Sequence, residues 1–243
     1  PVEKLSATIA QQVIEGGRTI CAEAGIPLAG GHSIDSPEPI FGLAVSGIVP
    51  IAQLKRNNTA QQGDLLLLTK PLGVGILSTA EKRGVLQEAD RITLHEQITQ
   101  LNSIGEKLGK IKGVNAMTDV TGFGLMGHLL EMASGSGCSA SIDYANVPLI
   151  EGLQSYISQR ISPDATPRNW NAYSSKIKFE KGVNVMEAFT VLPDPQTNGG
   201  LLISCAPSAL KDVQQLLNEN GLAPFSSPIG KMITKSEFGV YIN

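Results

Sequence analysis

Residues 116–135 contain the pattern that decides the fold: Ala-Met-Thr-Asp-Val-Thr-Gly-Phe-Gly-Leu-Met-Gly-His-Leu-Leu-Glu-Met-Ala-Ser-Gly. Residues 116–120 predict a short strand, and Thr121-Gly122 predicts a turn. Residues 123–134 predict a helix, which Gly135 ends. This stretch therefore predicts a strand that passes through a glycine-rich turn directly into an apolar helix.

The same mixture continues on both sides of this stretch. Before it, the pattern predicts a strand at 65–69 and helices at 74–83 and 92–108. After it, the pattern predicts strands at 138–144 and 201–205 and near residues 229 and 240, helices at 149–159, 186–189 and 208–218, and mostly irregular chain over 160–179. Because no regular βαβ repeat is present, we predict an α+β fold, or an irregular α/β fold, and not a doubly wound sheet.

The first fifty residues predict only part of a domain. Residues 3–24 predict a helix that Gly25 ends, and residues 26–29 predict a short strand. Residues 40–49 are small and apolar throughout, which predicts a second strand buried on both faces. We therefore expect two domains: residues 1–49, the C-terminal remainder of one domain, and residues 50–243, a complete α+β domain.

Composition excludes several classes of protein. The 243 residues have a formal net charge of −3 and no cluster of Lys and Arg, which argues against a nucleic-acid binder. The longest apolar stretch, residues 40–52, is interrupted and shorter than the roughly 20 residues that a membrane-spanning helix needs. We therefore expect no nucleic-acid partner and no membrane segment.

The cysteines and histidines show no disulfide or metal pattern. Cys21, Cys138 and Cys205 are few, odd in number and far apart, which is typical of reduced thiols in a cytoplasmic protein. The histidines are also widely separated, and His95 and His128 lie within helical patterns. We expect these two histidines to be core or surface residues and not catalytic bases.

A first glycine-rich loop reads Gly30-Gly31-His32-Ser33-Ile34-Asp35. Adjacent glycines allow a backbone to approach a ligand closely, and His32 and Ser33 add donors suited to phosphate oxygens. A tight turn with a capping serine explains the same residues, so both interpretations stay open.

A second loop, residues 118–124, places Asp119 between a strand and a helix. A carboxylate in this position can bind Mg²⁺, and the helix N-terminus beside it can offer amides to an anion. The alternative is that Asp119 or Thr121 caps the helix, which is the commoner use of such residues.

A third loop reads Asp194-Pro-Gln-Thr-Asn-Gly-Gly200 and leads into a buried strand. Its two glycines indicate that another backbone or a ligand packs tightly against the turn. A structural turn and a binding loop are both compatible with this pattern. The chain has neither a P-loop nor a Gly-x-Gly-x-x-Gly motif, which disfavours the two common types of nucleotide-binding enzyme.

Taken together, four blocks resemble the selenophosphate synthetase family, and they stand in the order and at the approximate spacing of that family. They are Ala29-Gly-Gly-His-Ser-Ile-Asp35, Phe41-Gly-Leu-Ala-Val-Ser-Gly47, Thr118-Asp-Val-Thr-Gly-Phe-Gly-Leu125 and Asp194-Pro-Gln-Thr-Asn-Gly-Gly-Leu-Leu202. Each block alone is a weak signal, whereas the combination is specific. The family belongs to the aminoimidazole ribonucleotide synthetase superfamily.

The resemblance implies a homodimeric, two-domain protein that binds ATP and Mg²⁺ and converts ATP, selenide and water into selenophosphate, AMP and phosphate. Gly31, His32 and Ser33 match the family's ATP-binding loop, and Asp119 matches a magnesium ligand. No residue matches the catalytic nucleophile, which in the family precedes this region. We therefore expect a truncated N-terminal domain, no catalytic residue in this chain and no activity of the isolated chain. The alternatives are another ATP-dependent kinase of the superfamily and a non-catalytic nucleotide-binding fragment.

Overall fold

The structure is a computed structural model that describes residues 5–243. The chain separates into two compact units, Pro1–Pro50 and Ile51–Asn243. The two units are described separately below.

The N-terminal unit contains one long helix, α1 (Ala7–Glu23), and extended chain. The side chain of Ser6 caps α1 by accepting a hydrogen bond from the amide of Ile9, and Gly25, with φ +69°, ends the helical region. The helix is confirmed over these bounds, while the first residues of the predicted range, 3 and 4, lie outside the described residues.

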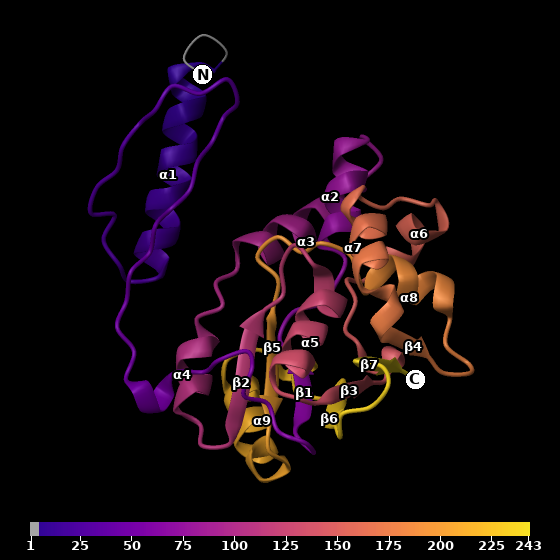
Figure 1. The fold of residues 1–243 in the computed structure, drawn as a ribbon. Coiled ribbons are helices and arrows are strands. Elements are labelled where there is room, and N and C mark those ends of the chain that lie inside the picture. The colour runs from indigo at the N-terminus through magenta and orange to yellow at the C-terminus, as the bar shows by residue number, and fades with distance from the viewer. Residues whose placement is uncertain (1–4) are drawn as a thin grey trace. The chain divides into compact units, whose positions relative to one another are not determined.

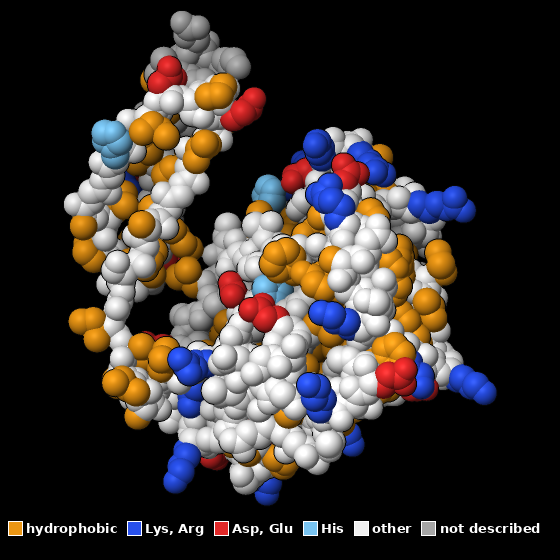
Figure 2. Space-filling model, in the orientation of Figure 1, with side chains coloured by type: hydrophobic (Ala, Val, Ile, Leu, Met, Phe, Trp, Pro, Cys, Tyr) orange, Lys and Arg blue, Asp and Glu red, His pale blue; other side chains and the backbone are white. Residues whose placement is uncertain are grey.

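Residues 26–50 of this unit correct a prediction. Two strands were expected, but the chain forms no strand over this range and runs out and back in extended form (Figure 1). The expected burial is also wrong, since Ile40 is 75% exposed and Val45 is 70% exposed. Figure 2 shows hydrophobic side chains along the surface of this unit. A strand needs a neighbouring strand to pair with, and the described residues of this unit supply none.

The second unit is built on a sheet of seven strands within residues 51–243, in the order β2-β5-β1-β6-β3-β7-β4. The first five strands in this order pair antiparallel, and β7 pairs parallel with both β3 and β4. The strands are β1 (Leu65–Leu68), β2 (Val114–Asp119), β3 (Ser139–Ile142), β4 (Ile177–Phe179), β5 (Leu201–Cys205), β6 (Gly230–Ile233) and β7 (Val240–Ile242). The mixed sheet confirms the predicted fold class.

Helices cover both faces of this sheet (Figure 1). They are α2 (Val74–Lys82), α3 (Glu88–Thr99), α4 (Ile104–Lys110), α5 (Gly124–Gly135), α6 (Leu153–Ser158), α7 (Ala165–Tyr173), α8 (Val185–Val191) and α9 (Leu210–Glu219). Leu66 and Leu68 face a core shared with α2 and α5, whereas Leu67 between them faces a second core shared with α4 and α9. Alternate side chains of a strand point to opposite faces, so four consecutive leucines fill two cores.

Two predicted ranges differ from the structure because distant residues decide them. The single helix expected over residues 92–108 is two helices, α3 and α4, separated at residues 100–103. The carbonyl of Gln100 accepts hydrogen bonds from the side chains of Lys70 and Asn198 instead of from a helical amide. Residues 160–179, expected to be mostly irregular, contain α7 and β4, and the ring of Trp170 packs against Phe179 and Phe189.

Candidate functional site

Segments far apart in the sequence meet at one edge of the sheet. Because β5 runs antiparallel to both β1 and β2, its first residues lie beside the last residues of those strands. Asp119, the last residue of β2, pairs with Leu201, the first residue of β5. Lys70 follows β1 at the same edge, and the pair Gly199-Gly200 precedes β5. The predicted loops 118–124 and 194–200 therefore lie against each other.

The carboxylate of Asp119 is exposed at this edge and has no hydrogen-bond or ion-pair partner among residues 5–243. The residue that caps α5 is Phe123, and no side chain accepts a hydrogen bond at this helix end. The alternative that Asp119 or Thr121 caps the helix is therefore wrong, and the carboxylate is free to face a ligand.

The backbone amides around the start of α5 are already occupied. The amide of Gly124 donates to the carbonyl of Thr121 at 2.9 Å, and the amide of Met126 donates to the carbonyl of Leu192 at 3.0 Å. The amide of Thr121 donates to Nε2 of His128 at 3.0 Å. The expectation that this helix end offers amides to an anion does not hold for these three groups.

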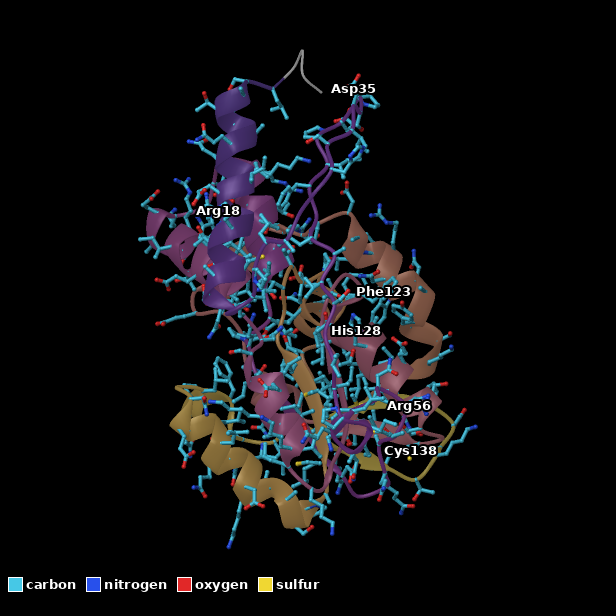
Figure 3. The ribbon with its side chains drawn as sticks, turned by 90° about the vertical axis from the view of Figure 1, so that its left-hand side faces the viewer. Arg18, Asp35, Arg56, Phe123, His128 and Cys138 are labelled. Carbon is cyan, nitrogen blue, oxygen red and sulfur yellow. The ribbon has the colours of Figure 1, made fainter. Side chains whose placement is uncertain are left out.

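His128 lies one helical turn into α5, beside Phe123, as Figure 3 shows. The two rings are 6.0 Å apart between centroids, and His128 is only 8% exposed. Burial lowers the pKa of His128, while the charges of Asp119 and Glu131 act in the opposite direction. The ring is therefore neutral near pH 7, with Nε2 accepting a hydrogen bond and the proton on Nδ1.

The two glycines before β5 lie between two other segments of backbone. A Cβ built on Gly199 would meet the carbonyl of Val120, and one built on Gly200 would meet the backbone of Lys70. The amide of Val120 also donates to the carbonyl of Gly200 at 2.9 Å. Another backbone or a ligand was predicted to pack against this diglycine; the structure shows backbone there, and it comes from both neighbouring loops.

Gln196 connects the start of α2 to the turn formed by residues 119–121, called the Asp119 turn below. Its side-chain oxygen accepts hydrogen bonds from the amides of Gly73 and Val74, both at 3.3 Å. The backbone amide of Gln196 donates to the carbonyl of Thr121 at 3.1 Å. Asp194 is fully buried beside it and accepts from the amide of Gly75 at 3.0 Å; burial raises the pKa of Asp194 to about 7. This loop therefore acts as a brace between two turns.

Lys70 joins the same network from the other side. Its ammonium donates to the carbonyl of Gln100 at 2.7 Å and to that of Asn198 at 2.8 Å. The residue is 3% exposed, and burial lowers the pKa of Lys70 to about 8. A lysine buried in this way fixes the loop before β5 to the connection between α3 and α4.

Comparison with known proteins identifies the family. The family model for the AIR synthase related protein, N-terminal domain, matches residues 2–49, and that for the C-terminal domain matches residues 61–243. The selenide, water dikinase of Pseudomonas putida is 48% identical over 242 residues, which cover 100% of this chain and 69% of that protein. The chain belongs to the selenide, water dikinase family.

Other members of the selenide, water dikinase family match equally well. The protein from Colwellia psychrerythraea is 50% identical over 233 residues, covering 96% of this chain and 66% of its own length. This chain thus spans about two thirds of the length of these relatives, which are enzymes by name. The resemblance expected from the four sequence blocks is confirmed.

Solved structures of more distant proteins share the fold. A thiamine-monophosphate kinase from Stenotrophomonas maltophilia matches with a TM-score of 0.57 at 18% identity, over 80% of this chain and 54% of that one. The hydrogenase maturation protein HypE in complex with ATP matches with a TM-score of 0.57 at 16% identity, over 77% of this chain and 49% of that one. At these identities the likeness shows a common fold and nothing finer.

In this member of the dikinase family, the predicted site residues fall in both units. Gly31, His32 and Ser33 lie in the extended chain of the N-terminal unit, are exposed and belong to no helix or strand. Figure 3 labels Asp35, the last residue of their loop. Asp119 lies in the second unit.

The structure brings residues to the sheet edge that sequence reasoning did not select. Lys70 follows four leucines and belongs to none of the predicted motifs, and His128 is predicted to be a core or surface residue. His128 is buried, as expected for a core residue, but its ring also accepts a hydrogen bond from the amide of Thr121 in the Asp119 turn. A polar side chain within an apolar helical stripe was the signal available for it. For Lys70, the sequence offers no comparable signal.

Three further properties concern metals, thiols and membranes. Within residues 5–243, no group of three or more His, Cys, Asp or Glu side chains is placed to hold a metal ion. The three cysteines are free, and burial raises the pKa of Cys205 to about 11. None of the helices in the described part of the chain is both long and apolar enough to span a membrane.

Proposed function

We propose that the whole protein makes selenophosphate from selenide, ATP and water and releases AMP and phosphate. The observation that supports this most strongly is 48% identity to a selenide, water dikinase along the full length of this chain. The stoichiometry requires that two phosphoanhydride bonds break. One phosphoryl group forms the bond to selenium, and the other leaves as phosphate with an oxygen from water.

A divalent cation is part of this proposal, with Asp119 as its protein ligand. An exposed carboxylate without a partner suits Mg²⁺, which binds through one or two carboxylates together with substrate phosphates and water. The described residues offer no larger ligand cluster, so the fit is to a shared site of this kind and not to a cage made by this chain. When bound there, Mg²⁺ would neutralise charge on the phosphate oxygens during transfer.

The N-terminal unit would supply the ATP-binding loop. In this proposal Gly31 gives room for a phosphate, and His32 and Ser33 donate to its oxygens. Residues 1–49 then belong to the ATP-binding and dimerisation domain of a homodimer, and residues 50–243 form the second domain. Three free thiols are compatible with a reducing, cytoplasmic location.

The test is AMP formation by the whole protein with ATP and Mg²⁺, with and without selenide. We expect AMP and selenophosphate only when selenide is present. Turnover with a different acceptor but not with selenide would assign the protein to another kinase of the superfamily. ATP binding without any turnover would leave it a nucleotide-binding protein.

A further inference from the structure

The Asp119 turn is held at the two residues that follow the carboxylate. The amide of Val120 donates to the carbonyl of Gly200, and the carbonyl of Thr121 accepts from the amides of Gly124 and Gln196. The amide of Thr121 donates to Nε2 of His128 at 3.0 Å. Among these contacts, the one from His128 is made by a side chain and can therefore be removed by substitution.

His128 occupies an unusual place for a polar ring. Its neighbours along the buried side of α5 are Leu125, Leu129 and Met132. Because Nε2 accepts a hydrogen bond from the backbone amide of Thr121, the ring proton lies on Nδ1, and Nδ1 is buried with no hydrogen-bond partner among residues 5–243. A buried donor without an acceptor costs free energy that an apolar side chain would avoid. The hydrogen bond that Nε2 accepts from the amide of Thr121 offsets this cost.

The same geometry excludes a role as general base. The lone pair of Nε2 already faces the amide of Thr121, and the hydroxyl of Thr121 lies 3.3 Å from the same nitrogen. Neither ring nitrogen is thus available to take a proton from a substrate. The chemistry available to His128 is to hold the turn.

We propose that His128 is a positioning residue that holds the Asp119–Thr121 turn in the form that presents the carboxylate of Asp119 to a divalent cation. The inference rests on the proposed role of Asp119. Without His128, the amide of Thr121 would turn toward another acceptor, and the backbone two residues after Asp119 would move with it. His128 thereby acts through Thr121 and touches neither cation nor substrate.

The test uses three substitutions of His128 in the whole protein. His128→Gln places a non-titrating oxygen near the position of Nε2, and His128→Leu removes the acceptor but keeps the volume. His128→Asn is the matched control, since its oxygen is polar but stops short of Thr121. Two readouts that do not depend on turnover are hydrogen exchange of the Thr121 amide and binding of Mn²⁺ in the presence of a non-hydrolysable ATP analogue, followed by EPR.

We expect His128→Leu and His128→Asn to lose protection of the Thr121 amide and to weaken Mn²⁺ binding by up to about tenfold, the equivalent of one hydrogen bond. His128→Gln should retain both properties within about threefold. The Mg²⁺ concentration required for turnover should rise in parallel, with less change in the rate at saturating Mg²⁺. Added to Asp119→Asn, the leucine substitution should weaken Mn²⁺ binding no further, because no carboxylate remains to be positioned.

Two results are distinguishable. If Asp119→Asn weakens Mn²⁺ binding but folded His128→Leu does not, the role of His128 is refuted and the proposed function stands. If Asp119→Asn itself leaves binding unchanged, the cation site is refuted and the role of His128 falls with it. Should His128→Leu not fold, the comparison of His128→Gln with His128→Asn decides the question.

Discussion

Gly200 leaves room for the backbone of Lys70. A Cβ built on Gly200 would lie 2.9 Å from the Cβ of Lys70 and closer still to its backbone nitrogen. The same glycine accepts a hydrogen bond from the amide of Val120 through its carbonyl. Because Gly200 has no side chain, the loop after β1 and the loop after β2 can both pack closely against it.

We predict that Gly200→Ala destabilises the second unit by about 2 kcal/mol or more, because backbone atoms cannot move aside as a flexible side chain can. Chemical denaturation of the variant measures this. Gly16→Ala in α1 is the matched control, since nothing lies within 4 Å of a Cβ built there. It should be neutral or stabilise α1 by up to about 1 kcal/mol. Equal stability of Gly200→Ala and wild type would refute the close approach.

Asp119→Asn should separate cation binding from folding. The carboxylate has no partner among residues 5–243 and caps no helix, so the free energy of unfolding should change by less than about 0.5 kcal/mol. The amide lacks the negative charge of a good Mg²⁺ ligand, so the Mg²⁺ concentration needed for ATP turnover should rise sharply. Measuring turnover against Mg²⁺ tests this, and unchanged Mg²⁺ dependence with normal turnover would end the idea.

Gly31→Val should weaken ATP binding and leave the fold intact. Nothing lies within 4 Å of a Cβ built on Gly31, so we expect the substitution to leave the fold intact while the side chain obstructs a phosphate that approaches the backbone. Titration of the whole protein with ATP, followed by calorimetry, measures the effect. Gly42→Val, at a position equally open, should bind ATP normally. If both variants bind like wild type, the Gly31 loop is a plain turn.

Lys70 should make stability depend on pH in the alkaline range. Burial lowers the pKa of Lys70 from 10.5 to about 8, and this outweighs the two carbonyl bonds that favour the charged form. Between these two pKa values the unfolded chain binds more protons than the folded chain, so the free energy of unfolding rises with pH. Below about pH 8 the cost of the buried charge is fully present, and it is relieved as the pH rises.

Lys70→Met isolates this effect, because it keeps the length of the side chain and removes its titration. Urea denaturation at about pH 7 and about pH 9.5 should show that wild type gains stability relative to the variant at the higher pH. A difference that is the same at both pH values would mean that the pKa of Lys70 is not lowered in the folded protein.

The sequence by itself determined the elements whose pattern is local. Leu65–Leu68 forms a strand because it is a short, fully apolar run, and residues 124–135 form a helix because the apolar pattern and the terminating Gly135 lie within the segment. Asp119 was selected for the same reason, since a carboxylate between a strand and a glycine-rich turn can be recognised without knowing what packs against it.

Only the tertiary structure decided the features that depend on distant residues. The side chains of Lys70 and Asn198 donate hydrogen bonds to the carbonyl of Gln100, where the single predicted helix is instead two helices, α3 and α4. His128 belongs by pattern to an apolar stripe, but its ring binds an amide in the turn before its helix. Periodicity reports which side of an element is buried and not which atom its side chain meets, and those partners are set by how the chain packs across the sheet.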